Sequence, residues 1–269
     1  MGKKVFVIDL AKCNGCYCCQ FMCKDEHAGN DWTPIAKPQP EVGQFWLKLT
    51  EEVRGSVPKV KVAYRPHLCM HCENAPCMKA CKTKGAKYRR DDGLVIIDPV
   101  KCTGCRNCND ACPYDAIYFN EDLNIAQKCT GCAHLLDNGW VEPRCADACP
   151  TLALKMLDEK DAKDIIANAE VWKPEYRTKP RVYYLNVPKQ FIGGTVYDPK
   201  AEEVYIGAEC VLTGGGKTYN VKTNNFGDFW FKDIPNGKFN LEIKAGGKSK
   251  VFKNIDTTTE CVNLGDIAI

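Results

Sequence analysis

The sequence predicts an α+β domain rich in cysteine, followed by an all-β domain. Three observations lead to this fold class. The chain has 269 residues, a length that suits two domains. Most of its 19 cysteines lie between residues 13 and 149. From about residue 191, apolar residues alternate with polar ones between turns of Gly, Asn and Asp, a pattern typical of antiparallel strands in a sandwich or barrel. We therefore expect domains at 1–190 and 191–269.

Four groups of four cysteines repeat along the first domain. Each group ends in C-x3-C, and Pro113 and Pro150 directly follow the third and fourth groups. The groups are Cys13, Cys16, Cys19 and Cys23; Cys69, Cys72, Cys77 and Cys81; Cys102, Cys105, Cys108 and Cys112; and Cys129, Cys132, Cys145 and Cys149. We expect Cys18 to be a packed spare, and Cys210 and Cys261 to act as small apolar side chains.

The spacing inside a group indicates iron–sulfur clusters. In residues 101–113, KCTGCRNCNDACP, the C-x2-C-x2-C run lets three thiolates reach one cluster. The fourth cysteine, followed by proline, points away and serves a neighbouring cluster, as in bacterial two-cluster ferredoxins. We therefore predict crossed ferredoxin-like units in the first domain, with all sixteen grouped cysteines as iron ligands and no catalytic residue among them.

Two other uses of cysteine are less favoured. Zinc sites use pairs of cysteines, whereas here triplets with a fourth member recur. A disulfide framework suits secreted chains, but the opening residues MGKKVFVIDLAKC contain no apolar leader, so we expect a reducing cytoplasmic location. We expect histidines such as His71 to be local hydrogen-bonding groups. Basic residues beside the cysteines either compensate cluster charge or are solvated; these are Lys12, Lys101, Arg106, Lys128 and Arg144.

Local patterns predict the elements between the cysteine groups. Alternating and turn-forming residues indicate short strands in the first domain, and a charged stretch with Ile-Ile indicates a short helix. In the second domain, FGDFWFKDIPNGKFNLEI predicts strand, turn and strand, with the turn at Pro235-Asn236-Gly237. The expected elements of the first domain are a hairpin insert at 44–64, a strand within 93–102, two strands within 116–129, a helix within 158–169, and a connector over 158–190.

Composition excludes several classes of function. The formal charge of +3 ignores cluster charge and does not predict a nucleic-acid partner. The sequence contains no run of 18 apolar residues, so we expect no membrane span. The chain also lacks a phosphate loop, a nucleophile elbow and a dinucleotide fingerprint, so we expect no substrate chemistry on this chain.

The four-group order, with the widened C-x2-C-x12-C-x3-C of the fourth group, resembles the iron–sulfur subunits that accompany molybdopterin oxidoreductases of the dimethyl sulfoxide reductase type. The resemblance covers about residues 3–190. It implies an electron-transfer function and a chain of four [4Fe–4S] clusters, or three if one set holds none. It also implies a heterodimer with a large catalytic subunit that holds the molybdopterin.

The resemblance further implies how the groups share clusters. Three cysteines of one group pair with the last cysteine of another. The implied sets are Cys13, Cys16, Cys19 with Cys149; Cys129, Cys132, Cys145 with Cys23; Cys69, Cys72, Cys77 with Cys112; and Cys102, Cys105, Cys108 with Cys81.

The second domain resembles a different module. The stretches GGTVYDP, GAECVL and NNFGDFWFKDIPNGKFNLEI are similar to the transthyretin-like sandwich, which is also found as a carboxypeptidase regulatory domain. Two other functions stay open. A free polyferredoxin would be a stable monomer that shuttles electrons, and a purely structural protein would use its clusters as folding staples. The β-rich tail favours the role of a subunit, since a mobile carrier has little need of it.

Overall fold

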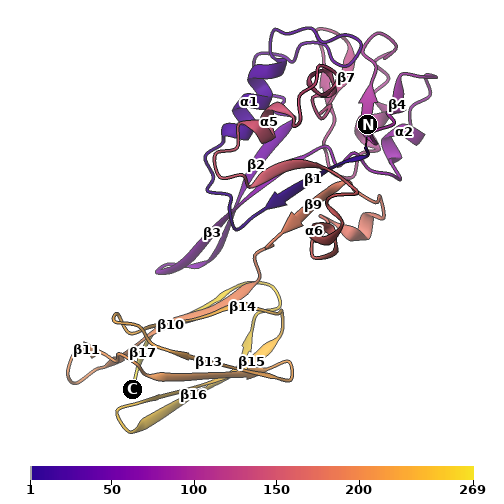
Figure 1. The fold of residues 1–269 in the computed structure, drawn as a ribbon. Coiled ribbons are helices and arrows are strands. Elements are labelled where there is room, and N and C mark those ends of the chain that lie inside the picture. The colour runs from indigo at the N-terminus through magenta and orange to yellow at the C-terminus, as the bar shows by residue number, and fades with distance from the viewer. Residues whose placement is uncertain (1) are drawn as a thin grey trace. The chain divides into compact units, whose positions relative to one another are not determined.

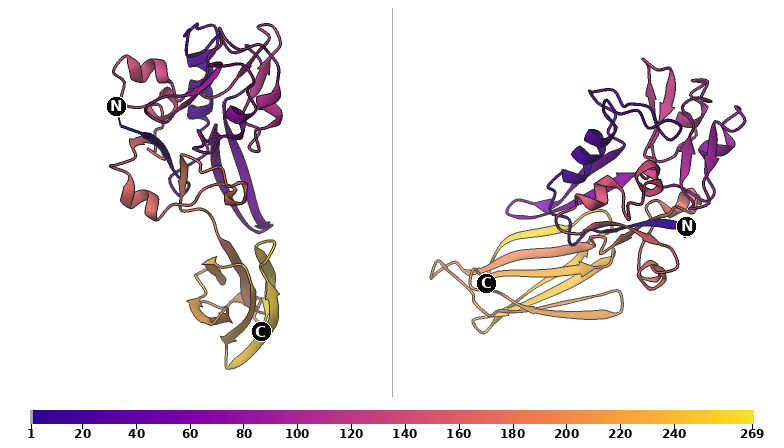
Figure 2. Two further views of the ribbon diagram at one scale, coloured as in Figure 1. Left: turned by 90° about the vertical axis from the view of Figure 1, so that its right-hand side faces the viewer. Right: turned by 45° about the horizontal axis from the view of Figure 1, so that its top comes forward.

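The computed structural model describes residues 2–269, and its contacts divide this chain into two units (Figures 1 and 2). The first unit comprises the residues up to Glu51 together with Ala63–Val187. The second comprises Glu52–Val62 and Pro188–Ile269. Each unit has its own apolar core, and all sixteen grouped cysteines belong to the first unit.

A three-stranded sheet supports the first unit. Strand β1 (Lys4–Asp9) is central, antiparallel to β8 (Leu154–Asp158) and parallel to β9 (Val182–Leu185). Successive side chains of a strand point to opposite faces. Phe6 therefore joins the large core that contains the cysteines, while Val5 packs in a smaller cluster on the other face. Both faces of β1 are covered, which explains its nearly continuous apolar sequence.

Short elements carry the cysteine groups, and the strands predicted within 93–102 and 116–129 are present. They are β5 (Val95–Ile97), which pairs with β4 (Lys87–Arg89), and the hairpin of β6 (Tyr118–Asn120) and β7 (Ile125–Gln127). The helices are α1 (Cys18–His27), α2 (Pro76–Lys79), α3 (Asn107–Asp110), α4 (Ala133–Asp137), α5 (Arg144–Asp147) and α6 (Lys163–Ala167), and a 3-10 turn covers Pro174–Tyr176. Helix α6 confirms the helix expected within 158–169.

The inserted hairpin consists of β2 (Leu47–Ser56) and β3 (Lys59–Leu68), so it starts later and runs further than the predicted 44–64. The residues at its tip belong to the second unit. There the Lys59 ammonium pairs with Asp228, and the Lys61 ammonium stands 4.8 Å from the centre of the Trp230 ring. The tip is thus fixed by buried charge and by a cation–π contact.

The rest of the second unit is almost entirely β-structure. Its two sheets share one core, to which alternate residues such as Phe229, Phe231 and Leu241 contribute. One sheet contains β10 (Gln190–Asp198), β11 (Glu203–Val204), β14 (Asp228–Ile234) and β17 (Val262–Ala268); the other contains β12 (Glu209–Gly214), β13 (Lys217–Lys222), β15 (Lys238–Ala245) and β16 (Lys248–Asp256).

The predicted strand, turn and strand around Pro235 correspond to β14, the turn and β15. These two strands do not pair with each other. Strand β14 pairs with β10, whereas β15 lies between β12 and β16. The turn therefore carries the chain from one sheet to the other.

Candidate iron–sulfur centres

A shared backbone feature shapes all four cysteine loops. The residue before the second cysteine has a left-handed conformation in every group: φ is 74° at Gly15, 44° at His71, 70° at Gly104 and 65° at Gly131. Glycine adopts this conformation without steric cost. A Cβ on Gly104 would also lie only 2.5 Å from the backbone oxygen of Asn124. The left-handed residue bends each loop back, so that successive cysteines can face a common centre.

His71 takes the place of glycine in the second group and is held by its side chain. Its ring is buried, and Nδ1 accepts a hydrogen bond from the backbone N–H of Val95 at 3.0 Å. Burial lowers the pKa of His71 well below its usual value, and nearby positive charge, Lys128 foremost, acts in the same direction. The ring is therefore neutral, and its Nδ1 can accept the hydrogen bond from Val95. This confirms that His71 is a local hydrogen-bonding group.

Packing of α1 against α5 joins the first and fourth cysteine groups (Figure 1). Burial raises the pKa of Cys19 to about 12, and the neighbouring Cys13 and Cys149 contribute to the rise. Burial likewise raises the pKa of Cys23 well above its usual value, with added repulsion from Cys129 and Cys132. The last cysteine of each group thus lies among the first three of the other.

Packing of α2 against α3 joins the second and third groups in the same crossed way. The pKa of Cys72 is raised to about 12 by burial and then by its neighbours, which include Cys112 of the third group. Cys81 of the second group lines one cavity together with the first three cysteines of the third. The four sets brought together are Cys13, Cys16, Cys19 and Cys149; Cys23, Cys129, Cys132 and Cys145; Cys69, Cys72, Cys77 and Cys112; and Cys81, Cys102, Cys105 and Cys108.

The sulfur donors of these four cysteine sets are chemically suited to bind iron–sulfur clusters. None of the 19 cysteines forms a disulfide, and soft thiolate sulfur is the usual ligand of iron–sulfur clusters. Within residues 2–269, no group of three or more His, Cys, Asp or Glu residues is placed to hold a single metal ion. A [4Fe–4S] cluster needs its ligands further apart than a single metal ion does, because each thiolate binds its own iron at a separate corner. The raised thiol pKa values mean that cluster binding must displace protons.

Several donors approach the sulfurs. The backbone N–H groups of Ala126 and Gly131 donate to Cys102 Sγ at 3.5 Å and to Cys129 Sγ at 3.4 Å. His27 Nε2 lies 3.9 Å from Cys132 Sγ, and burial together with the nearby His134 lowers the pKa of His27 to about 3. Hydrogen bonds to sulfur delocalise thiolate charge and tune cluster potentials.

Two lysines are buried among the cysteine loops. Lys128 Nζ donates to the backbone oxygens of Val95 and of Cys129, the latter at 2.9 Å. Lys87 is 8% exposed, and its Nζ has no oxygen or nitrogen hydrogen-bond partner among residues 2–269. Burial raises the pKa of Cys108, while the positive charge of Lys87 and the approach of its ammonium to the Cys108 thiol oppose this effect. Sequence reasoning considered Lys128 but missed Lys87, because no cysteine lies beside it in the chain.

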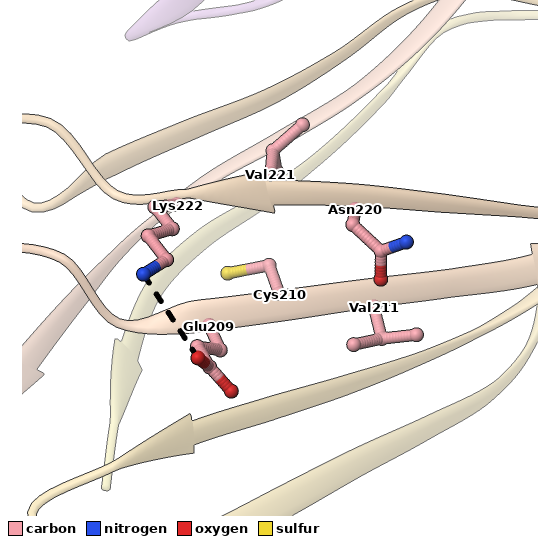
Figure 3. Close-up of a pocket in the computed structure, with 6 residues that line it drawn as sticks. All are labelled: Glu209, Cys210, Val211, Asn220, Val221 and Lys222. Carbon is pink, nitrogen blue, oxygen red and sulfur yellow. Dashed lines mark ion pairs between the residues drawn. The ribbon is translucent and has the colours of Figure 1, made fainter.

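The second unit carries a surface hollow of about 360 Å³ along β12 and β13 (Figure 3). At one end Glu209 and Lys222 form an exposed ion pair at 4.0 Å. The Cys210 side chain is buried, and burial raises the pKa of its thiol to about 12. Cys210 is thus protonated at neutral pH and acts as a small apolar side chain, as expected. None of the residues that line this hollow is a reactive group.

Crossed cysteine sets on a scaffold of short strands and helices define a ferredoxin-type protein with several clusters. A family model described as a 4Fe-4S dicluster domain matches residues 60–159. The pyrogallol hydroxytransferase small subunit of Pelobacter acidigallici is 43% identical over 260 residues, which are 93% of this chain and 93% of that protein. This chain belongs to the family of iron–sulfur electron-transfer subunits of molybdopterin oxidoreductases.

Further relatives are subunits of other enzymes. A tetrathionate reductase subunit of Salmonella typhimurium is 35% identical over 71% of this chain and 75% of its own length. A sulfite dehydrogenase subunit of Allochromatium vinosum is 33% identical over 69% of this chain and 83% of its own length. The chain is therefore a cluster-bearing, electron-transferring subunit that works with a catalytic partner.

Within residues 2–269, no helix is both long and apolar enough to cross a membrane.

Proposed function

We propose that this chain is the electron-transfer subunit of a molybdenum enzyme that moves a hydroxyl group between polyhydroxybenzenes such as pyrogallol and phloroglucinol. The match to the pyrogallol hydroxytransferase small subunit carries this proposal, because it extends over 93% of the chain and so includes most of the β-rich second unit. The reductase and dehydrogenase relatives cover only 71% and 69% of it. The alternative is the same role in another molybdopterin oxidoreductase.

The sixteen grouped cysteines are the proposed ligands of four [4Fe–4S] clusters, three from one group and the last from its partner group. The proximity of Cys23 to Cys129 and Cys132, and of Cys112 to Cys72, supports the crossing. When bound, such clusters accept and pass on single electrons. The protein's own residues bury most of the ligands, although Cys16 and Cys105 are exposed, and they direct N–H groups at the sulfurs.

The remaining features of the proposal follow from the two units. The partner is one large subunit that holds the molybdopterin and performs the hydroxyl transfer. The 19 cysteines form no disulfide, which suits a reducing compartment such as the cytoplasm. We propose that 1–190 form the cluster domain and 191–269 a transthyretin-like sandwich; two four-stranded sheets around a shared core support the sandwich.

Metal analysis of the native complex tests this function. Purified without oxygen, the chain should contain about 16 iron and 16 sulfide, and molybdenum should copurify at a fixed ratio. The complex should transfer hydroxyl groups between trihydroxybenzenes. An iron-rich chain that purifies alone would instead indicate a free electron carrier. A colourless chain, or one that contains zinc, would exclude both functions.

A further inference from the structure

Lys87 lies at the wall of the cavity that one cysteine set surrounds. The cavity is lined by Lys87 together with Cys81, Cys102, Cys105 and Cys108. Lys87 comes from β4, which pairs with β5, so its backbone position is fixed by strand hydrogen bonds. The side chain is 8% exposed, its Nζ has no oxygen or nitrogen hydrogen-bond partner among the described residues, and it approaches the thiol of Cys108.

A buried ammonium group that meets no opposite charge is costly, because it has lost its hydration without electrostatic compensation. Proteins retain such a group where an opposite charge is present in the working state. Four thiolates around a [4Fe–4S] cluster provide that charge, since the assembly carries about −2 when oxidised and about −3 when reduced. The Nζ of Lys87 and the four sulfurs at one cavity therefore complement each other.

We propose that Lys87 is the counter-ion of the cluster held by Cys81, Cys102, Cys105 and Cys108, and that it raises this cluster's reduction potential. The inference rests on the proposed function, which places a cluster at these four sulfurs. Reduction adds one electron to the cluster and breaks no bond. A fixed positive charge stabilises the reduced form more than the oxidised form, and burial strengthens the attraction.

Arg106 lines the same cavity but differs in its surroundings. Its side chain is 52% exposed and pairs with Glu121 at 2.5 Å. Solvent and the carboxylate both screen its charge. Arg106 is therefore the matched control, because it is a cation at the same cavity whose charge is already compensated.

The test is a potentiometric titration of the anaerobically purified complex, followed by electron paramagnetic resonance. In Lys87→Met, one cluster should become at least tenfold harder to reduce, equivalent to a midpoint lower by about 59 mV for one electron. Lys87→Arg and Arg106→Gln should change the equilibrium constant for reduction of any cluster by no more than about threefold. The proposal is overturned if Lys87→Met shifts no midpoint beyond that range, or if Arg106→Gln shifts one equally.

Iron and sulfide counts separate this proposal from the proposed function. A wild-type complex without iron would overturn the function itself. Normal iron in every variant with unchanged midpoints would overturn only the role of Lys87. If Lys87→Met loses one cluster while Lys87→Arg keeps it, the counter-ion is needed to hold that cluster, which supports the proposal. Loss of the cluster in both variants would show that Lys87 acts by packing alone.

Discussion

Cys23→Ser is expected to damage the cluster of the fourth cysteine group and to leave the cluster of the first group intact. Cys23 belongs to the first group in sequence, but it is buried beside Cys129 and Cys132. Serine oxygen is a poor replacement for a soft thiolate, so the cluster should be lost or converted to a form with fewer irons. The iron content should fall by between about one and four atoms per chain.

Reference variants identify the affected cluster. The magnetic resonance spectrum of Cys23→Ser should match that of Cys129→Ser and differ from that of Cys13→Ser. Cys18→Ser is the control: it removes a thiol from the same helix that lies outside the four sets, and its iron content should equal that of the wild type. A Cys23→Ser spectrum that matches Cys13→Ser would contradict crossed ligation.

The cysteine groups illustrate why much of the candidate site can be predicted from sequence. Spacing such as C-x2-C-x2-C places three sulfurs within one loop, and local geometry then limits which of them can share a centre. The left-handed positions at Gly15, Gly104 and Gly131 are likewise visible in sequence as C-x-G-C. The cysteines of one group and the turns between them are local features, so a single chain segment specifies them, whereas the pairing of one group with another is implied only by the family resemblance.

Groups that reach the sites from distant segments could not be predicted in this way. Lys87 and His27 approach cysteines far from them in sequence, which only the folded chain brings close. The same limit applies to the strands: alternation predicts β14 and β15, but not that they belong to different sheets. Pairing between strands depends on contacts that no local pattern records.

The hairpin tip is a further case, because the sequence predicts an insert at 44–64 but not what its tip contacts, while the contacts group Glu52–Val62 with the second unit. Lys59 is the residue that shows most clearly that the tip is not exposed. Its side chain is 6% exposed, and its ammonium pairs with Asp228, whose side chain is 23% exposed and also accepts a hydrogen bond from Thr195 Oγ1 at 2.9 Å. An exposed hairpin tip would not bury a lysine.

Asp228→Asn is therefore expected to loosen the tip strongly. It leaves a buried ammonium without its counter-charge, and breaking a buried pair in this way costs about 3–5 kcal/mol. Hydrogen exchange of the backbone amides in 52–62 measures the effect, because these amides exchange when the tip opens. Their protection should fall at least about 100-fold, since about 1.4 kcal/mol corresponds to tenfold.

Glu209→Gln is the matched control for that measurement. It neutralises one partner of an exposed pair in the same unit, in which Glu209 and Lys222 stand 4.0 Å apart, and such pairs contribute about 1 kcal/mol or less. The double variant Lys59→Met, Asp228→Leu removes both charges and should recover much of the lost protection, because no buried charge is left unpaired. Equal protection at 52–62 in Asp228→Asn and Glu209→Gln would mean that the Lys59–Asp228 pair does not hold the tip, which would then depend on the contact between Lys61 and Trp230.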